Sequence, residues 1–344
     1  MVGSGERAYV YAKACGITGK SFIGKNRSRL AALSRLSELD RLIFGTDARD
    51  LPERELLPDL EGRIINRTAK QIVTIVNSFR EPPELLVRMV REFEYTDLKR
   101  AITAVAGGER TLPERTGIGR FAALDFSDYP RFDKILTGTE FEFLLEDIED
   151  LRGPSGPSTA LIQNKLDRHY YTCLWNSLFK LAPSDRSSIE RILAEELSLR
   201  NAAWALRMRS YYGMSAEQTR EYLVFIPVRK SRPGAVDATL ADDALASLTM
   251  SLDSPADWAR WRWVKFLNRT GEHWTADPRH FQNAAAQYLY RLARHSFRQR
   301  PFSLDTAACF IKLKLFEEDL LTSVAEGLSL GLGALETLSM LGAS

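Results

Sequence analysis

Apolar positions recur at spacings of three and four residues along most of the chain, which is the periodicity of amphipathic helices. Regular alternation of strands with helices is missing from the pattern, and a short apolar run such as 222–226 does not extend into a sheet pattern. The pattern predicts an all-α protein. The expected helices cover residues 30–43, 65–79, 85–105, about 187–212, 281–300 and 303–330, with a further helical stripe over 166–181.

Proline and glycine mark several of the expected helix ends. The segment Glu81-Pro82-Pro83-Glu84 is predicted to stop one helix and start the next, because proline disfavours a helical residue before it. Gly107-Gly108 can supply a left-handed cap for that second helix. Residues 183–185 are predicted as a turn, with Ser187 or Ser188 as the N-cap of the helix that follows.

One helical phrase occurs three times, at 94–102, 195–203 and 316–324. In each copy acidic residues precede a leucine, and the positions after it turn small or apolar. The leucines are Leu98, Leu199 and Leu320, so the offsets are 101 and 121 residues. A repeat of about one hundred residues predicts three similar helical modules, which more often build a surface or a socket than a catalytic pocket.

Loose segments set the predicted module boundaries. Residues 110–132 are rich in Gly, Pro and Thr, 152–158 read as a linker, and 227–254 are polar and contain proline. The predicted modules are residues 1–110, 111–230 and 231–344.

The composition is that of a globular protein, with 44% hydrophobic and 27% charged residues. The 47 basic and 45 acidic residues leave a net charge of only +2, which argues against a nucleic-acid partner. The N-terminus has no apolar signal-peptide core, and no uninterrupted apolar stretch is long enough to span a bilayer. We therefore expect a cytosolic protein, or one held at a membrane through a partner.

Cysteines and histidines give no metal-binding spacing. They are Cys15, Cys173, Cys309, His169, His273, His280 and His295. The cysteines lie far apart and are expected to be buried free thiols. The acidic residues of 140–150 are interpreted as a solvated helix face. No catalytic residue, cofactor or metal ligand is predicted.

Residues 14–21 fit the relaxed phosphate-loop pattern [AG]-x4-G-K-[ST], ending in Gly19-Lys20-Ser21. Residues 121–125 even imitate an apolar strand ending in a metal-binding aspartate. The first glycine is replaced by Ala14, however, and the motif requires a parallel sheet that the chain does not predict. A phosphate-loop NTPase is therefore kept as a remote alternative to a helix interrupted or ended near Gly16 and Gly19.

A cluster of tryptophans offers two interpretations. It consists of Trp258, Trp261, Trp263 and Trp274, with Arg260 and Arg262 among them. Such a cluster can be a base-stacking platform. The near-neutral charge of the chain favours a core staple of the third module, or a contact patch.

Short phrases in a fixed order carry a resemblance to a known family. Residues 9–13 (YVYAK) look like its opening Y-x-x-A-R/K helix, 60–79 like its second long helix, and 94–99 like its D/E-x-x-N-L/I-K/R helix start. Residues 166–171 look like its L-D-x-x-Y-Y/F opening, and 310–320 like its closing helix. The chain resembles the C-type subunits of bacterial and archaeal V-type (A/V-type) ATPases, which are related to the d-type subunits of the eukaryotic V-ATPases.

The resemblance implies a non-catalytic part of the central rotor in an ATP-driven ion-translocating complex. Three helical modules would lie about a pseudo-threefold axis in a funnel-like body. Its wide end would receive the central-stalk subunits, and its narrow end would rest on the cytoplasmic face of the membrane proteolipid ring. The protein would transmit torque, would need no cofactor, and would contact the membrane only through the complex. A free-standing helical-repeat scaffold with other partners is the alternative.

Torque transfer requires interfaces that resist slip, and charged groups around an apolar centre provide this resistance. The charged residues of the repeated phrases are the candidates for a partner interface. They are Asp97, Arg100, Glu196, Arg200, Lys314, Glu317 and Asp319. The alternative for most of them is ion pairing within one helix, worth about 0.3–0.5 kcal/mol for each pair.

Overall fold

The computed structural model describes residues 3–24, 26–151, 158–228, 238–269, 271 and 273–342. This part of the chain is helical, and its only β pairing is an isolated bridge between Pro227 and Thr239. The all-α prediction is confirmed. The α-helices are α1 (Ser4–Thr18), α2 (Arg27–Ala31), α3 (Leu36–Phe44), α4 (Glu53–Val76), α5 (Glu84–Ala106), α6 (Phe132–Leu136), α7 (Leu145–Asp150), α8 (Thr159–Leu178), α9 (Pro183–Tyr212), α10 (Ala216–Glu221), α11 (Asp242–Ser247), α12 (Pro278–Gln299), α13 (Leu304–Ser329) and α14 (Ala334–Met340).

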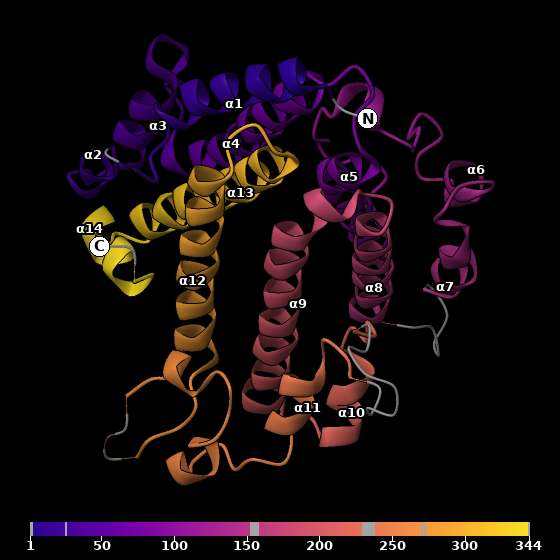
Figure 1. Cartoon of the computed structure of the whole chain (residues 1–344), viewed down its shortest axis with the longest axis vertical. Helices are drawn as coiled ribbons and strands as arrows, with labels where there is room; N and C mark the ends of the chain where they lie inside the picture. The colour runs from indigo at the N-terminus through magenta and orange to yellow at the C-terminus, as the bar shows by residue number, and fades with distance from the viewer. Residues whose placement is uncertain are drawn as a thin grey trace.

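Three pairs of long helices follow one another along the chain, α4 with α5, α8 with α9, and α12 with α13 (Figure 1). Proline sets the turn in each pair. Pro83 is the N-cap of α5, Pro183 opens α9, and Pro301 lies between α12 and α13. Proline suits these places because the first residues of a helix have no internal partner for their N–H groups.

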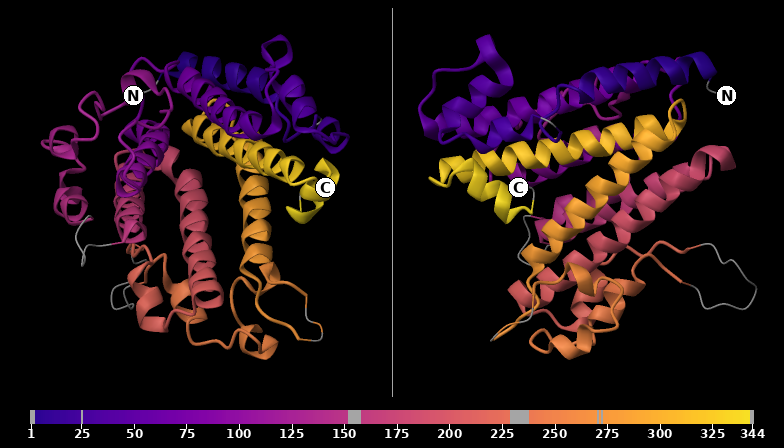
Figure 2. Two further views of the ribbon diagram at one scale, coloured as in Figure 1. Left: turned by 180° about the vertical axis from the view of Figure 1, so that it is seen from behind. Right: turned by 60° about the vertical axis from the view of Figure 1, so that its left-hand side comes forward.

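The helix pairs pack against one another in a cyclic order. The second helix of each pair lies along the first helix of the next, so that α5 packs on α8, α9 packs on α12, and α13 packs on α4 (Figures 1 and 2). The last of these contacts closes the cycle, because α13 near the C-terminus returns to α4 of the first pair. The fold therefore holds distant parts of the sequence together through all three pairs.

The largest hydrophobic core contains residues from Val10 in α1 to Leu338 in α14. It includes residues of all three predicted modules, so the modules share their interior. None of the described helices combines the length and the apolar character needed to cross a bilayer.

The tryptophan cluster belongs to a second core between α9 and α12. Trp258, Trp261, Trp263 and Trp274 are each at most 8% exposed, and each indole N–H donates a hydrogen bond within the chain. A base-stacking platform needs exposed rings. The interpretation as a core staple is confirmed, and the platform is excluded.

Most predicted helices are present, and the differences have local causes. The expected helix over 30–43 is divided into α2 and α3 by the bend at residues 32–35. The expected turn at 183–185 is wrong, because Pro183 occupies the first turn of α9, with Ala182 and not Ser187 or Ser188 as its N-cap. The predicted linker over 152–158 lies outside the described residues except for Ser158, which caps α8.

Candidate functional site

A pocket of about 390 Å³ opens between α9, α12 and α13. The repeated phrase places charged side chains on α9 and α13 along its wall, while α12 contributes mainly alanine and leucine. On α9 the residues 196, 200, 203 and 207 follow at steps of four, three and four, so they share one face of the helix. The charged residues of the pocket are Glu92, Glu196, Arg200, Arg207, Lys312 and Asp319.

An ion pair between two helices forms part of the wall. The Nζ atom of Lys312 on α13 lies 2.9 Å from Oε1 of Glu196 on α9. Burial disfavours the charged ammonium, but the carboxylates of Glu196 and Glu92 outweigh this effect and raise the pKa of Lys312. Lys312 is therefore charged at neutral pH, and the pair links the second helix pair to the third.

Aromatic rings hold the neighbouring charges in place. The guanidinium of Arg200 lies over the rings of Tyr171 and Trp204, at 4.8 Å and 5.6 Å from their centroids. The hydroxyl of Tyr170 on α8 donates a hydrogen bond of 3.1 Å to Glu92 on α5. The pocket wall is thus fixed by contacts that reach α5 and α8 as well as α9 and α13.

Asp319 faces the pocket and remains exposed to solvent there. Desolvation by the surrounding protein, followed by repulsion from Glu92, raises the pKa of its carboxyl. Its neighbour Glu318 faces Thr68 of α4 instead, and one of its carboxylate oxygens is buried without a hydrogen-bond partner.

The composition of the pocket is that of a surface that recognises polypeptide side chains. Its lining residues include no serine, cysteine or histidine, so they form no nucleophile with an imidazole base. They do present both signs of charge beside apolar surface, which is the composition of a specific protein interface.

The candidate residues from the sequence fall into three groups. Glu196, Arg200 and Asp319 are brought together in the pocket. Arg100 is exposed on α5, with its guanidinium 3.7 Å from Asp97. Glu196 forms its salt bridge with Lys312 of α13, and not with Arg200 one turn along its own helix.

The other candidates have intrachain partners and little surface left for a second protein. Asp97 is 6% exposed and accepts hydrogen bonds from the main-chain N–H and the hydroxyl of Thr116. Lys314 and Glu317 form a buried ion pair within α13, and Glu317 also accepts a 2.7 Å hydrogen bond from the N–H of Phe22. These residues anchor irregular segments to α5 and α13. A role for any candidate at a partner interface stays a prediction.

Three charged members of the pocket were not predicted from the sequence, namely Glu92, Arg207 and Lys312. Arg207 follows the second copy of the repeated phrase on α9. Glu92 lies outside the repeated phrase, and Lys312 precedes the third copy. A usable signal for Lys312 existed, because Lys312 and Asp319 are seven residues apart and so lie on one face of the same helix.

The phosphate-loop alternative loses its structural context. Residues 14–18 end α1, and Gly19 is its C-cap. The N–H groups of Gly19, Lys20 and Ser21 donate to the carbonyls of Cys15, Ile17 and Thr18, at 2.9, 3.1 and 3.0 Å. They are therefore not directed at a phosphate, and no strand precedes them in the described part of the chain.

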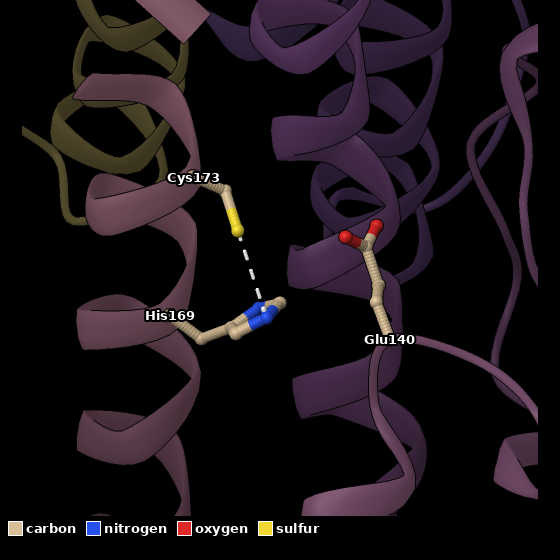
Figure 3. A group of neighbouring side chains, drawn as sticks. All are labelled: Glu140, His169 and Cys173. Atoms are coloured by element: carbon tan, nitrogen blue, oxygen red, sulfur yellow. Dashed lines mark hydrogen bonds between the residues drawn. The ribbon is translucent and has the colours of Figure 1, made fainter. Parts of the chain in front are cut away.

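One group of side chains has the composition of a metal site (Figure 3). His169 and Cys173 lie one turn apart on α8 and face Glu140, and their ligand atoms lie within 4.8 Å of one another. The distance from Cys173 Sγ to His169 Nε2 is 3.6 Å. Burial lowers the pKa of His169, which favours the neutral imidazole.

The surroundings of this group favour a structural role. The carboxylate of Glu140 accepts hydrogen bonds from both Arg88 and Arg91. A divalent cation bound there would lie beside two guanidinium groups and would be repelled by both. The hydroxyl of Tyr95 lies 2.7 Å from Nδ1 of His169, so the cluster ties α5 to α8 and to the segment before α7. The free cysteines are buried at Cys309 and half-buried at the other two positions.

The fold defines an all-helical protein of three helix pairs, with a charged pocket between α9, α12 and α13. It is not the α/β fold of a phosphate-loop nucleotide-binding enzyme. The family described as ATP synthase (C/AC39) subunit matches residues 23–337, so the chain belongs to that family. The resemblance to the C-type subunits of V-type ATPases is thereby confirmed. A protein of Treponema pallidum (strain Nichols), described only as uncharacterized, is 25% identical over 328 residues, which cover 94% of this chain and 92% of that protein.

Proposed function

We propose that this protein is a non-catalytic component of the central rotor in a V-type ATPase or ATP synthase that translocates ions. It acts as a socket that joins the central stalk to the membrane proteolipid ring and transmits torque between them. Family membership supports its place in such a complex. On this proposal it is a peripheral protein on the cytoplasmic side of the membrane.

The cyclic closure of the helix pairs is the observation that carries the proposal. Each of α5, α9 and α13 packs on the first helix of another pair, so a load on one pair is distributed over the other two. Packed helices are stiff because their interiors are as dense as organic crystals. We propose that the three pairs lie about a pseudo-threefold axis in a funnel-like body.

The charged pocket is the proposed contact of the central stalk. Glu196, Arg200, Lys312 and Asp319 are preorganised there by α9 and α13, beside the apolar surface of α12. Charges fixed in this way select one partner orientation and resist slip under torque. The opposite end of the body is proposed to rest on the proteolipid ring.

Affinity purification of the tagged full-length chain from detergent-solubilised membranes tests this proposal. We expect central-stalk, catalytic and proteolipid subunits to copurify in a constant ratio. Recovery of the folded chain with unrelated partners alone would support the scaffold alternative instead. A parallel ATP-binding assay should give background signal both for the chain and for its Lys20→Ala variant; saturable binding that Lys20→Ala abolishes would contradict a non-catalytic socket.

A further inference from the structure

A second hollow of about 650 Å³ lies on another face of α12, between α9 and the 3₁₀ turn Val264–Phe266. It shares no lining residue with the charged pocket. Four basic side chains surround it, Arg191 from α9, Lys265 from the turn, and Arg291 and His295 from α12. We call this hollow the basic groove.

The charge of the basic groove is not balanced by nearby acids. The side chains of Arg191, Lys265 and Arg291 are exposed, and no carboxylate in the described part of the chain forms a salt bridge with any of them. The two acids nearest to Arg191 along α9 already have other partners, since Glu190 pairs with Arg186 at 3.2 Å and Glu195 pairs with Arg262 at 2.9 Å. The sequence 278–300 contains no acidic residue. The groove therefore carries an uncompensated positive charge on a chain whose total charge is nearly neutral.

The floor of the basic groove is aromatic and aliphatic. Phe266 is 5% exposed and its ring centroid lies 5.4 Å from that of Tyr288, while Leu292 is half-buried beside them. The ammonium of Lys265 lies 5.3 Å from the centroid of Phe266, so the cation rises from the apolar floor. A ligand that fills the groove must place apolar atoms at its base and negative charges at its rim.

We propose that the basic groove is a docking site for an acidic amphipathic segment of another polypeptide, with leucine-like side chains on one face and carboxylates beside them. A helix laid between α9 and the Val264–Phe266 turn would meet the cations at its edges and the floor with its apolar face. The headgroup layer of a membrane is flat and would reach the rim but not the recessed floor. The inference concerns a face separate from the central pocket and does not depend on the proposed rotor function.

Fluorescence anisotropy with the full-length chain tests the proposal. The probe is a labelled 18-residue peptide of glutamate and leucine at helical spacing, and a lysine-for-glutamate version is its control. The variant Arg191→Glu/Arg291→Glu reverses two groove charges, and Arg29→Glu/Arg41→Glu makes the same change at exposed positions elsewhere. We expect saturable binding of the acidic peptide, weakened at least tenfold by the groove variant and less than twofold by the control variant. Binding should also weaken as salt is raised.

Carbodiimide crosslinking then locates the peptide, because it joins an amine to a carboxylate with loss of water and adds no linker. We expect an amide between Lys265 and a peptide glutamate, which Lys265→Arg removes. The intrachain pair of Lys165 and Asp147, 2.7 Å apart, provides the positive control for coupling. Equal peptide affinity of the two double variants, no peptide binding, or crosslinks at other lysines would each overturn the proposal. So would binding to anionic phosphatidylserine vesicles, and not to the peptide, that the groove variant alone loses.

Discussion

Lys312 and Glu196 lie 116 residues apart in the sequence, and their side chains meet at 2.9 Å in the wall of the charged pocket. Both are largely shielded from solvent, at 12% and 15% exposure. This contact joins the last helix pair to the middle one at the place where we propose that the stalk binds.

Removing either partner of this pair is expected to destabilise the protein. Lys312→Met leaves the Glu196 carboxylate without its cation, and Glu196→Gln leaves the ammonium without its anion, at a cost of roughly 1–3 kcal/mol each. The double variant should lose less than the sum of the two, because neither charge is then left alone. Urea unfolding of the four proteins measures this coupling, and additive losses would mean that the pair contributes nothing.

Asn201 in α9 should be among the most sensitive polar positions. Its side chain donates to the carbonyls of Val224 and Leu240 and accepts from the N–H of Val224, and it is only 1% exposed. Asn201→Ala leaves buried main-chain groups unpaired and should cost about 2–4 kcal/mol, with faster hydrogen exchange at the Val224 amide. The control is Asn283→Ala, since Asn283 donates to the Met340 carbonyl at the surface; a loss of the same size there would contradict the explanation by burial.

A side chain at Gly327 is expected to push α13 away from α14. A Cβ at this position would overlap the hydroxyl of Thr337, which is buried at 7% exposure. We predict that Gly327→Ala lowers the free energy of unfolding by about 1–3 kcal/mol. Gly16→Ala is the matched control, because nothing lies near its Cβ and alanine favours a helix; it should stabilise α1 by roughly 0.5–1 kcal/mol. Thermal unfolding compares the two variants. An unchanged stability of Gly327→Ala would contradict the prediction, because it would mean that Thr337 and α14 move aside without cost.

Glu318 predicts a dependence of stability on pH. Burial first, and the adjacent Asp319 second, raise the pKa of its carboxyl to about 8, whereas the unfolded chain ionises near the usual value of about 4.3. The contribution of the Glu318 carboxyl to the free energy of unfolding is therefore fully present at low pH, where the group is neutral in both states. It is lost as pH rises from about 4 to about 8. Glu318→Gln, which stays neutral, should exceed the stability of the wild type at pH 8 by roughly 1–3 kcal/mol and by clearly less at pH 5.

The exposed Glu326 on the same helix supplies the comparison for this experiment. Glu326→Gln removes the same charge without removing a buried one, so its effect should be within about 0.5 kcal/mol at both pH values. Denaturant unfolding at pH 5 and pH 8 gives the difference. An equal benefit from both variants would point to net charge and not to the burial of Glu318.

Periodicity predicted the long helices because each carries an apolar stripe that the shared core buries. It failed at Pro183, since Pro-Ser-Asp is equally typical of a turn and of the first turn of a helix, and only tertiary packing decides between them. The pocket was half predicted. The repeated phrase contains Glu196, Arg200 and Asp319, but the partnership of Glu196 with Lys312 depends on how α9 and α13 meet, which no local pattern encodes.

The family could be predicted from the sequence, through the resemblance. The partners that some candidate charged residues have within the chain became visible only in the structure. Asp97 and Glu317 carry charges of the kind expected at an interface, yet both accept main-chain hydrogen bonds from segments distant in the sequence. A buried carboxylate and an interface carboxylate look alike in a single sequence, because only the fold decides which one reaches the surface.

Blocking the charged pocket tests the central claim most directly. Ala286 lies on the α12 side of the pocket, so Ala286→Trp fills part of its volume whatever the charge of the partner, and Ala12→Trp adds the same ring at an exposed position of α1. The measurement is the dissociation constant of purified central-stalk subunits for each variant, with thermal unfolding as a check of the fold. We predict that Ala286→Trp weakens stalk binding at least tenfold while Ala12→Trp does not change it. Wild-type affinity in a folded Ala286→Trp protein would contradict the assignment of this pocket as the contact of the central stalk.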